Sequence, residues 1–345
     1  MTEIFDLKRL AQTPLTAEEA ARLFGELLSG HAGEDEIKAF LIALSARKPA
    51  TSEFVGAVQA MRAQMKAITA PPLAIDLCGT GGDGLGTLNI STAVSFVVAA
   101  AGVPVAKHGN RSMSSKSGAA DILEALGVRI DLPPSLAEQV LRETGIVFLF
   151  AQTHHPAMRH VAGARRAIGK RTIFNLLGPM ASPARVKRQL VGVFAEEWLM
   201  PYAEALKALG CERAMVVHGA DGLDELTTTD VTYVATLKDG VITRTEIAPE
   251  DAGLKRARMV ELQGGTAKEN AEALKALFAG KSGAYRDIVL LNSAGALMVA
   301  GLASDILSGM ALARTALDSG AAKAKLDHLV AASTREAANS ETSDP

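Results

Sequence analysis

The sequence predicts an α/β fold made of a small all-helical domain and a larger α/β domain with a mostly parallel central sheet. Residues 1–66 show helical patterns only, whereas from about residue 73 onward short apolar strands alternate with helices. Pro71 and Pro72 separate the two regions. Short apolar strands between helices are typical of parallel sheets that are covered on both faces. The length of 345 residues is sufficient for two domains.

The helical domain is expected over residues 1–66. Thr16 and Glu19 form a capping-box pattern in front of an apolar run, which predicts a helix start. The spacing of apolar residues predicts two further helices in this region, Glu36–Arg47 and Ser52–Met65. Helical spacing returns later in the chain, and we expect a segment of about residues 159–185 to join this domain.

The α/β domain is expected over residues 70–158 and 186–330, and the polar residues 331–345 are expected to be a disordered tail. Asp239 and Gly240 lie at the centre of a predicted β-hairpin. The other predicted strands are Leu73–Leu77, Val103–Ala106, Val128–Leu132, Ile146–Ala151, Leu190–Phe194 and Ala214–His218. Helices are predicted at Ser91–Ala101, Asp121–Leu126 and Ala267–Phe278, and helices continue through Asn292–Leu317.

Composition indicates an ordinary globular enzyme of the cytoplasm. Hydrophobic residues make up 48% and charged residues 21% of the chain, and the formal net charge is -2, so we expect no binding to nucleic acid or membrane. The N-terminus lacks the apolar core of a signal peptide, and the longest apolar stretches are too short to span a bilayer. Cys78 and Cys211 are too few for a disulfide framework or a zinc site.

A glycine-rich segment follows the first predicted strand. Between Gly79 and Gly86, five of eight residues are glycine, which lets the backbone bend sharply and present N–H groups to an anion. The helix that follows adds further N–H groups and a positive dipole end. We therefore predict a phosphate or pyrophosphate site. A dinucleotide site is excluded because no acidic residue follows about twenty positions later, and a Walker A loop because no Lys-Ser or Lys-Thr pair follows the glycines.

Asp83 lies inside this glycine-rich segment and has two interpretations. A carboxylate repels a phosphate unless a cation or a bound hydroxyl offsets it, so Asp83 could indicate a cation. Alternatively, it belongs to an Asp-Gly turn.

A second polar cluster, residues 107–118, follows the second predicted strand and should lie beside the glycine-rich segment at the carboxyl edge of the sheet. This arrangement favours a shared anion site over the alternative of a solvated loop. Its cations are Lys107, Arg111 and Lys116, and its neutral donors are Asn110, Ser114, Ser115 and Ser117.

A third cluster contains the adjacent carboxylates Asp224 and Glu225 after another predicted strand. Neighbouring carboxylates repel each other and need either a cation or exposure to solvent. Oxygen ligands without Cys or clustered His suit Mg²⁺ held jointly with phosphate. Taken alone, a surface acidic turn is the simpler interpretation, and Asp221 could belong to such a turn.

Together these clusters resemble the anthranilate phosphoribosyltransferase family, which shares its fold with pyrimidine nucleoside phosphorylases. The resemblance covers about residues 74 to 230 and is carried by the segments DLCGTGGDGLGTLNIST, VAKHGNRSMSSKSGAADILEALGV, FLFAQTHHPAMRHVAGARRAIGKRTIFNLLGP and VVHGADGLDEL. It implies a homodimer with a helical and an α/β domain. It also implies transfer of the phosphoribosyl group of phosphoribosyl pyrophosphate to anthranilate, a step of tryptophan biosynthesis.

The resemblance also implies the functional residues. Mg²⁺, as two ions, would be bound by Ser91, Asp224 and Glu225. Phosphoribosyl pyrophosphate would be bound by Gly79, Gly82, Asp83, Thr87, Asn89, Ser91, Thr92, Lys107 and Ser115. Anthranilate would be bound by Gly79, His108, Asn110, His155, Arg165, Gly178 and Pro179. His108 and His155 could act as a general base, but a role as hydrogen-bonding walls of the anthranilate path is the simpler interpretation.

Two residues depart from the family pattern, Ser182 in place of Asn and Thr266 in place of Asp. Neither falls on an implied ligand-binding position.

Two rival functions are a pyrimidine nucleoside phosphorylase and a non-enzymatic nucleic-acid-binding relative. The pair Asp224-Glu225 and the stretch HHPAMRHVAGARR argue against the first. Basic segments at Arg185–Arg188 and Lys255–Arg258 would have to carry the second, but a nucleic-acid binder ordinarily shows a larger basic stripe.

Overall fold

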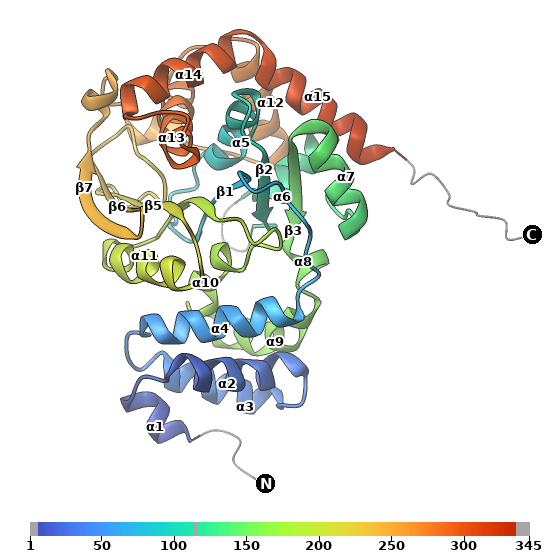
Figure 1. The fold of residues 1–345 in the computed structure, drawn as a ribbon, viewed down its shortest axis with the longest axis vertical. Coiled ribbons are helices and arrows are strands. Elements are labelled where there is room, and N and C mark those ends of the chain that lie inside the picture. Colours follow the sequence, from blue (N-terminus) through green and yellow to red (C-terminus); the bar gives the residue numbers. More distant parts are fainter. Residues whose placement is uncertain (1–5, 113–115, 336–345) are drawn as a thin grey trace, which may run out of the picture.

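The computed structural model describes residues 6–112 and 116–335. A bundle of helices forms one end of the molecule, and a sheet covered by helices forms the other (Figure 1). At the helical end, α9 (Arg159–Ile168) packs against α2 and α3. The first four helices of the chain lie at this end: α1 (Leu7–Gln12), α2 (Ala17–Ser29), α3 (Glu34–Leu44) and α4 (Thr51–Gln64).

The start of α2 confirms the predicted capping box. The Thr16 hydroxyl accepts a hydrogen bond from the Glu19 N–H at 3.2 Å, and the Glu19 carboxylate accepts one from the Thr16 N–H at 2.9 Å. These bonds satisfy two N–H groups that the first helical turn leaves without partners.

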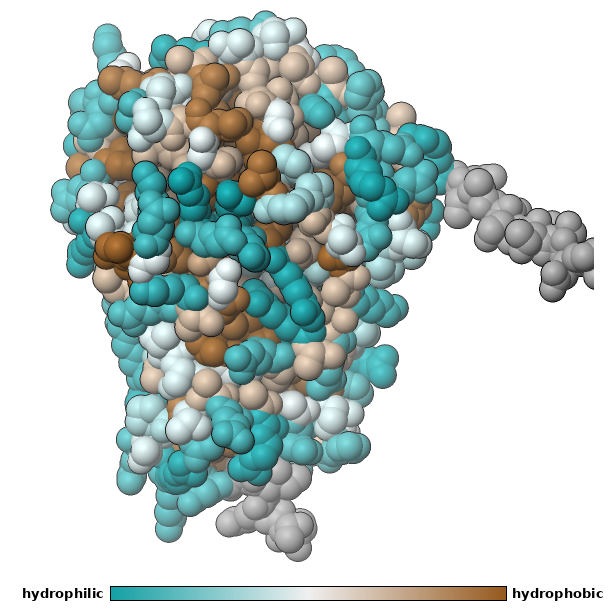
Figure 2. All heavy atoms as spheres, in the orientation of Figure 1, coloured by the Kyte–Doolittle hydropathy of each residue, from teal (hydrophilic) through white to brown (hydrophobic). Residues whose placement is uncertain are grey.

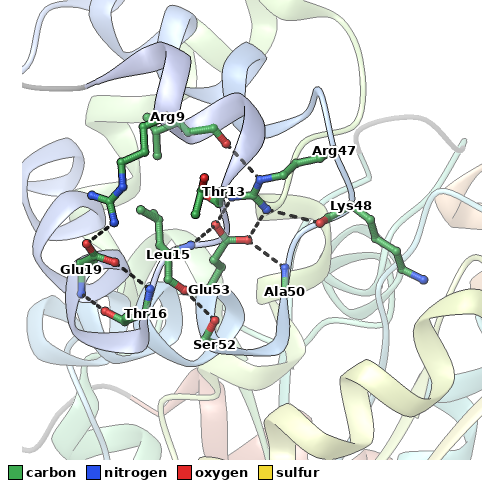
Figure 3. A network of polar contacts seen from close by, with 11 residues as sticks. Arg9, Thr13, Leu15, Thr16, Glu19, Arg47, Lys48, Ala50, Ser52 and Glu53 are labelled. Carbon is green, nitrogen blue, oxygen red and sulfur yellow. Dashed lines mark hydrogen bonds and ion pairs between the residues drawn. The ribbon is translucent and has the colours of Figure 1, made fainter.

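A buried ion pair ties the first four helices together (Figure 3). Glu53, on α4, is fully buried and lies 2.5 Å from Arg47. Its carboxylate also accepts the N–H groups of Leu15 at 3.0 Å and Ala50 at 2.8 Å. Arg47 in turn donates to the carbonyls of Leu10 and Thr13. Every oxygen of this carboxylate therefore has a partner, which is the condition under which a buried charge is tolerated.

The sheet has seven strands in the order β3-β2-β1-β4-β5-β6-β7. The first five in this order pair in parallel, and β6 and β7 pair antiparallel at one edge. The strands are β1 (Ile75–Gly79), β2 (Val105–Gly109), β3 (Ile146–Phe150), β4 (Arg188–Gly192), β5 (Arg213–Gly219), β6 (Thr232–Lys238) and β7 (Val241–Ile247). The predicted mostly parallel sheet is therefore confirmed, including the hairpin.

Helices cover both faces of this sheet. One face packs against α5, α13 and their neighbours, and the other packs against α11 and the helical end. The longer helices around the sheet are α5 (Ile90–Ala100), α6 (Ala119–Ala125), α7 (Pro134–Thr144), α11 (Leu199–Ala208), α12 (Ala267–Phe278), α13 (Ala284–Ala300), α14 (Ile306–Asp318) and α15 (Ala321–Thr334). Short helices are α8 (Ala151–His154) and α10 (Phe174–Leu177), with 3-10 turns at Pro156–Met158, Pro179–Ala181, Glu196–Trp198, Pro249–Ala252 and Met259–Leu262.

The predicted strand Val128–Leu132 is wrong. These residues form an irregular connection between α6 and α7, and their alternating apolar side chains are buried. The Val128 N–H donates to the Leu123 carbonyl, and the Arg129 N–H donates to the Ser333 hydroxyl of α15. The apolar side chains alternate here because they pack onto helices. A sequence pattern with a period of two residues cannot distinguish such packing from the pairing of a strand in a sheet.

One prediction near the C-terminus is confirmed and another is corrected. The helices expected through Asn292–Leu317 are the later part of α13 and α14, and Gly301, in a left-handed conformation with φ +86°, ends the first of them. The disordered tail expected over residues 331–345 is wrong for residues 331–334, which belong to α15, and residues 336–345 lie outside the described residues. The boundaries of the two domains remain predictions.

Large hydrophobic side chains are exposed at several places on the described surface. Leu307 and Leu312 both lie on α14, and Figure 2 shows hydrophobic side chains mixed with hydrophilic ones on the face that it presents. Within residues 6–112 and 116–335, no helix has both the length and the apolar composition needed to cross a membrane. The exposed residues are Leu7, Ile42, Leu73, Val241, Val260, Leu302, Leu307 and Leu312.

Candidate active site at the carboxyl edge of the sheet

Four adjacent parallel strands end in glycine at the carboxyl edge of the sheet, at Gly109, Gly79, Gly192 and Gly219. A methyl group on Gly192 would lie 1.5 Å from the Asp224 carbonyl oxygen, and one on Gly79 would lie 2.3 Å from Asp224 Oδ2. Only glycine therefore leaves room for Asp224 to lie directly on the ends of β1 and β4. Sequence reasoning assigned Gly79 to anion binding and missed Gly192 altogether.

The glycine-rich segment forms a loop that Asp224 holds in place. The Gly81 N–H donates to Asp224 Oδ2 at 2.8 Å, and Asp83 Oδ1 accepts the Leu85 N–H at 3.2 Å. Positive φ angles of +68° at Gly81 and +80° at Gly82 explain why glycine occupies these positions. Hereafter we call residues 79–86 the glycine loop.

The carboxylate of Asp83, which belongs to this loop, lies close to those of Asp224 and Glu225. Burial, followed by the charge of Asp83, raises the pKa of Asp224 to about 7. Burial, followed by the charge of Asp224, raises the pKa of Glu225 to about 8. Asp83 therefore belongs to a turn, as the second interpretation expects, and also faces the acidic pair, while the cation of the first interpretation stays a prediction. Asp221 belongs to a turn, as its carboxylate accepts the Leu223 N–H and the Thr227 hydroxyl.

This donor set fits Mg²⁺ that is shared with a substrate. Among the residues that the structure describes, no group of three or more His, Cys, Asp or Glu side chains is arranged to hold a metal by itself. Mg²⁺ usually keeps several waters and binds through one or two carboxylates together with substrate phosphates. The mutual repulsion of Asp83, Asp224 and Glu225 is the feature that a cation would relieve.

Lys107 and Ser91 lie beside this acidic cluster. The Lys107 side chain is buried, and its ammonium group donates to the Leu77 carbonyl and, at 3.1 Å, to the Ser91 hydroxyl. The Glu225 carboxylate accepts the Ser91 N–H at the start of α5. The structure thus brings Ser91, Lys107 and Glu225 together, although they are far apart in sequence.

Asn89 and Thr87 fix the connection between the glycine loop and α5. Asn89 donates to the Ser117 carbonyl at 3.2 Å and accepts from Asn270 at 2.8 Å. Thr87 forms an isolated β-bridge with Gln263.

The other residues singled out between positions 92 and 115 have different surroundings in the structure or lie outside its described part. The Thr92 hydroxyl is buried and has no partner among the described residues. Arg111 is not available to an anion, because it forms ion pairs with Asp121 and Glu124. Ser115, predicted to bind phosphoribosyl pyrophosphate, lies outside the described residues, as does Ser114.

His108 and His155 form a neutral pair of rings whose centroids lie 5.1 Å apart. Burial lowers the pKa of His155 to about 4 and lowers that of His108 well below its usual value. His108 Nδ1 lies 3.2 Å from the Gly178 carbonyl oxygen, which can only accept, so Nδ1 carries the proton and Nε2 is an acceptor. The Nε2 atoms of both rings are buried without a partner in the described part of the chain.

The guanidinium group of Arg165 packs against an aromatic ring. Arg165 lies on α9, and its guanidinium group is 5.3 Å from the centroid of the Phe174 ring. Burial lowers the pKa of Arg165, but a guanidinium group stays protonated in proteins. Of the described acidic residues, none lies within ion-pair distance of it. Pro179 is buried, and Asn110 lies exposed just after β2.

The chain matches two family models in succession. Residues 7–65 match the helical bundle domain of the glycosyl transferase family, and residues 71–323 match its a/b domain. Anthranilate phosphoribosyltransferase from Azorhizobium caulinodans is 55% identical over 320 residues, which cover 93% of each chain. The chain belongs to the anthranilate phosphoribosyltransferase family. The corresponding enzyme from Rhodopseudomonas palustris strain BisB18 is 54% identical and is covered to 95%, with 94% of this chain aligned.

Solved structures of the anthranilate phosphoribosyltransferase family share the fold. The crystal structure of the Thermus thermophilus enzyme is 41% identical and superimposes with a TM-score of 0.90 over 94% of this chain and 98% of its own. The Saccharomyces cerevisiae enzyme in complex with phosphoribosyl pyrophosphate and Mg is 26% identical with a TM-score of 0.88, over 96% of this chain and 97% of its own. The predicted family and fold class are therefore confirmed, and the two rival functions are not favoured.

Sequence reasoning missed two further residues near this family's site. Asp76 is fully buried and accepts the His108 N–H at 3.0 Å, and burial raises its pKa to about 6. Asp76 could have been found from the sequence, because it is a charged residue inside an otherwise apolar predicted strand. Arg171 donates to the Gly82 carbonyl, and no local pattern predicts this contact because the two residues lie on different elements.

Proposed function

We propose that this chain transfers the phosphoribosyl group of phosphoribosyl pyrophosphate to the amine of anthranilate. The products are N-(5-phosphoribosyl)anthranilate and pyrophosphate, as required for tryptophan biosynthesis. The observation that supports this proposal most strongly is the cluster that Asp83 of the glycine loop forms with Asp224 and Glu225, beside Lys107.

The diphosphate subsite lies around the glycine loop. Departure of pyrophosphate leaves positive charge on the sugar and negative charge on the leaving group. Mg²⁺, when bound with the substrate as two ions through Ser91, Asp224 and Glu225, supplies charge stabilisation for that leaving group. Lys107 and the N–H groups at the start of α5 add fixed positive potential there. The residues proposed to bind phosphoribosyl pyrophosphate are Gly79, Gly82, Asp83, Thr87, Asn89, Ser91, Thr92, Lys107 and Ser115.

The anthranilate subsite lies around the histidine pair. Arg165 would bind the carboxylate, because a planar guanidinium group matches it with two parallel hydrogen bonds. The neutral rings of His108 and His155 offer acceptors for the amine and an uncharged wall for the aromatic ring. The other residues proposed to line this path are Gly79, Asn110, Gly178 and Pro179.

Neither a general base nor a covalent nucleophile is required. The amine of anthranilate is already neutral, and the lowered pKa values of His108 and His155 make both rings weak bases. Burial raises the pKa of the Cys78 and Cys211 thiols, which disfavours the nucleophilic thiolate. Catalysis would then rest on alignment and electrostatics. As the family resemblance implies, we propose that the chain acts as a homodimer in the cytoplasm.

The decisive test is the fluorescence loss of anthranilate after addition of phosphoribosyl pyrophosphate and Mg²⁺. We expect turnover with Mg²⁺ and none with EDTA. A parallel assay with uridine or thymidine and inorganic phosphate tests the phosphorylase alternative. Cleavage of a nucleoside without consumption of anthranilate would overturn the proposal.

A further inference from the structure

Arg171 joins the glycine loop to a different part of the molecule. Its guanidinium group donates to the Gly82 carbonyl and lies 4.3 Å from the centroid of the Phe194 ring. A methyl group built on Gly82 would lie 3.5 Å from Arg171 Nε, so the guanidinium group also lies alongside the Gly82 backbone. Hydrogen bond, ring contact and close approach thus place one side chain against the loop.

The other anchors of the loop come from the sheet and its connections. Asp224 holds the Gly81 N–H, the Gly192 carbonyl accepts the Thr80 N–H, and the Gly264 N–H donates to the Gly86 carbonyl. Arg171 instead precedes Ile173 and Phe174, whose side chains belong to the core of the helical end.

The base of Arg171 is well fixed. The Thr172 N–H donates to the Asn175 side chain, and the Asn175 N–H donates to the Thr172 carbonyl, each at 3.0 Å. The Phe194 N–H donates to the Thr80 hydroxyl at 3.2 Å, so the backbone of the residue whose ring contacts Arg171 is bound to the loop. A rigid support on both sides lets Arg171 define where the Gly82 carbonyl points.

The direction of that carbonyl matters for the loop's chemistry. In a trans peptide, the carbonyl of one residue and the N–H of the next point in opposite directions. With its carbonyl turned to Arg171, the Gly82–Asp83 peptide turns the Asp83 N–H away from Arg171. Gly82 tolerates positive φ without steric cost, so the loop backbone alone does not enforce this orientation.

We infer that Arg171 is a positioning residue that sets the glycine loop for the sugar diphosphate. It acts through the carbonyl of Gly82, which is not among the residues proposed to bind anthranilate. This inference rests on the proposed function, because it assigns the loop to phosphoribosyl pyrophosphate.

The test compares Arg171→Ala and Arg171→Lys with the full-length wild-type chain. Lys170→Ala is the matched control, since it removes an exposed positive charge from the adjacent residue. For Arg171→Ala we expect the KM for phosphoribosyl pyrophosphate to rise about tenfold, the scale of one hydrogen bond to a charged donor. The KM for anthranilate should stay within about twofold of wild type. Arg171→Lys should retain most of the defect, because an ammonium group lacks the planar fork and ring stacking.

Hydrogen–deuterium exchange in the free protein gives a readout independent of turnover. Arg171→Ala should increase uptake in the peptide that covers residues 79–88, and Lys170→Ala should not. A raised KM without faster exchange would mean that Arg171 contacts the substrate directly, which would overturn the positioning role. Full recovery by Arg171→Lys, or an equal rise in both KM values, would also overturn it. If the wild-type chain transferred no phosphoribosyl group, the proposed function would fail, while the exchange data would still decide the loop's dependence on Arg171.

Discussion

Glu53 at the helical end and Asp224 at the sheet edge are both buried carboxylates, but their surroundings differ. Glu53 contacts Arg47 at 2.5 Å and accepts two backbone N–H groups. Asp224 accepts the Gly81 N–H but faces the like charges of Asp83 and Glu225. The surroundings of Glu53 therefore supply a compensating positive charge, whereas those of Asp224 supply further negative charge.

The difference separates a structural polar network from a ligand site. A buried charge with a complete set of partners is tolerated in the folded protein, and removing one of those partners is strongly destabilising. A cluster of like charges in a folded chain costs free energy, which binding of a cation and its substrate recovers. The same contrast holds for cations, because Arg47 is saturated with partners whereas Arg165 has none among the described carboxylates.

The largest expected effect comes from neutralising the acidic pair. Changing Asp224→Asn and Glu225→Gln together should lower kcat/KM by about a thousandfold or more, which corresponds to about 4 kcal/mol. The free energy of unfolding in EDTA should not fall, since repulsion is removed. Steady-state kinetics and chemical denaturation measure the two quantities. Full activity of the double variant would show that these residues form only an acidic turn.

Neutralising Glu53 should have the opposite profile. Glu53→Gln leaves Arg47 without its counter-charge and should lower the free energy of unfolding by about 3–5 kcal/mol. At temperatures where the variant is folded, kcat/KM should stay close to the wild-type value, because the network joins α1–α4 and none of its residues belongs to the candidate site (Figure 3). Denaturant unfolding checks the first expectation. If the free energy of unfolding of Glu53→Gln equalled that of the wild type, the network around Glu53 would not be structural and the proposed difference between the two regions would be wrong.

Removing the unpaired cation should affect one substrate only. Arg165→Ala should weaken the use of anthranilate by about 1.5–3 kcal/mol, the scale of a charge-assisted hydrogen bond. Affinity for phosphoribosyl pyrophosphate should change little. Arg166→Ala, which removes the next, exposed cation of α9, is the control. Equal losses for both substrates would make Arg165 structural.

The smallest expected effect is a pH dependence of stability in the metal-free protein. Folded-state pKa values of about 7 for Asp224 and 8 for Glu225 exceed those of unfolded carboxyl groups, which lie near 4. The folded state therefore holds more protons, and its stability falls as pH rises toward 8. Between pH 6.5 and 8 the free energy of unfolding in EDTA should fall by about 1–2 kcal/mol. The double variant should lack this slope, and an identical slope in both proteins would contradict the assignment.

Local patterns predicted most of the fold. The Thr16 capping box and the apolar strands were predictable because their partners lie within a few residues or because periodic burial reveals them. Val128–Leu132 misled because burial against helices produces the same alternation as a sheet. In the site, the glycine-rich segment and the adjacent acids Asp224 and Glu225 could be recognised because their residues are neighbours in the sequence. Gly192 and Arg171 were not, because each is explained by a contact with a distant segment.

The hairpin of β6 and β7 has a practical consequence for engineering. Strand β6 runs antiparallel to β5, with Thr232 opposite Gly219 and Leu237 opposite Ala214. Its connection to β7, at Asp239 and Gly240, therefore lies beside the amino ends of the parallel strands, whereas the candidate site lies at their carboxyl ends. Both residues are exposed and adopt left-handed backbone conformations, as in a tight two-residue hairpin turn. This turn is the natural point for attaching a fluorophore or inserting an affinity peptide, since a label there reports on the molecule without approaching its substrates.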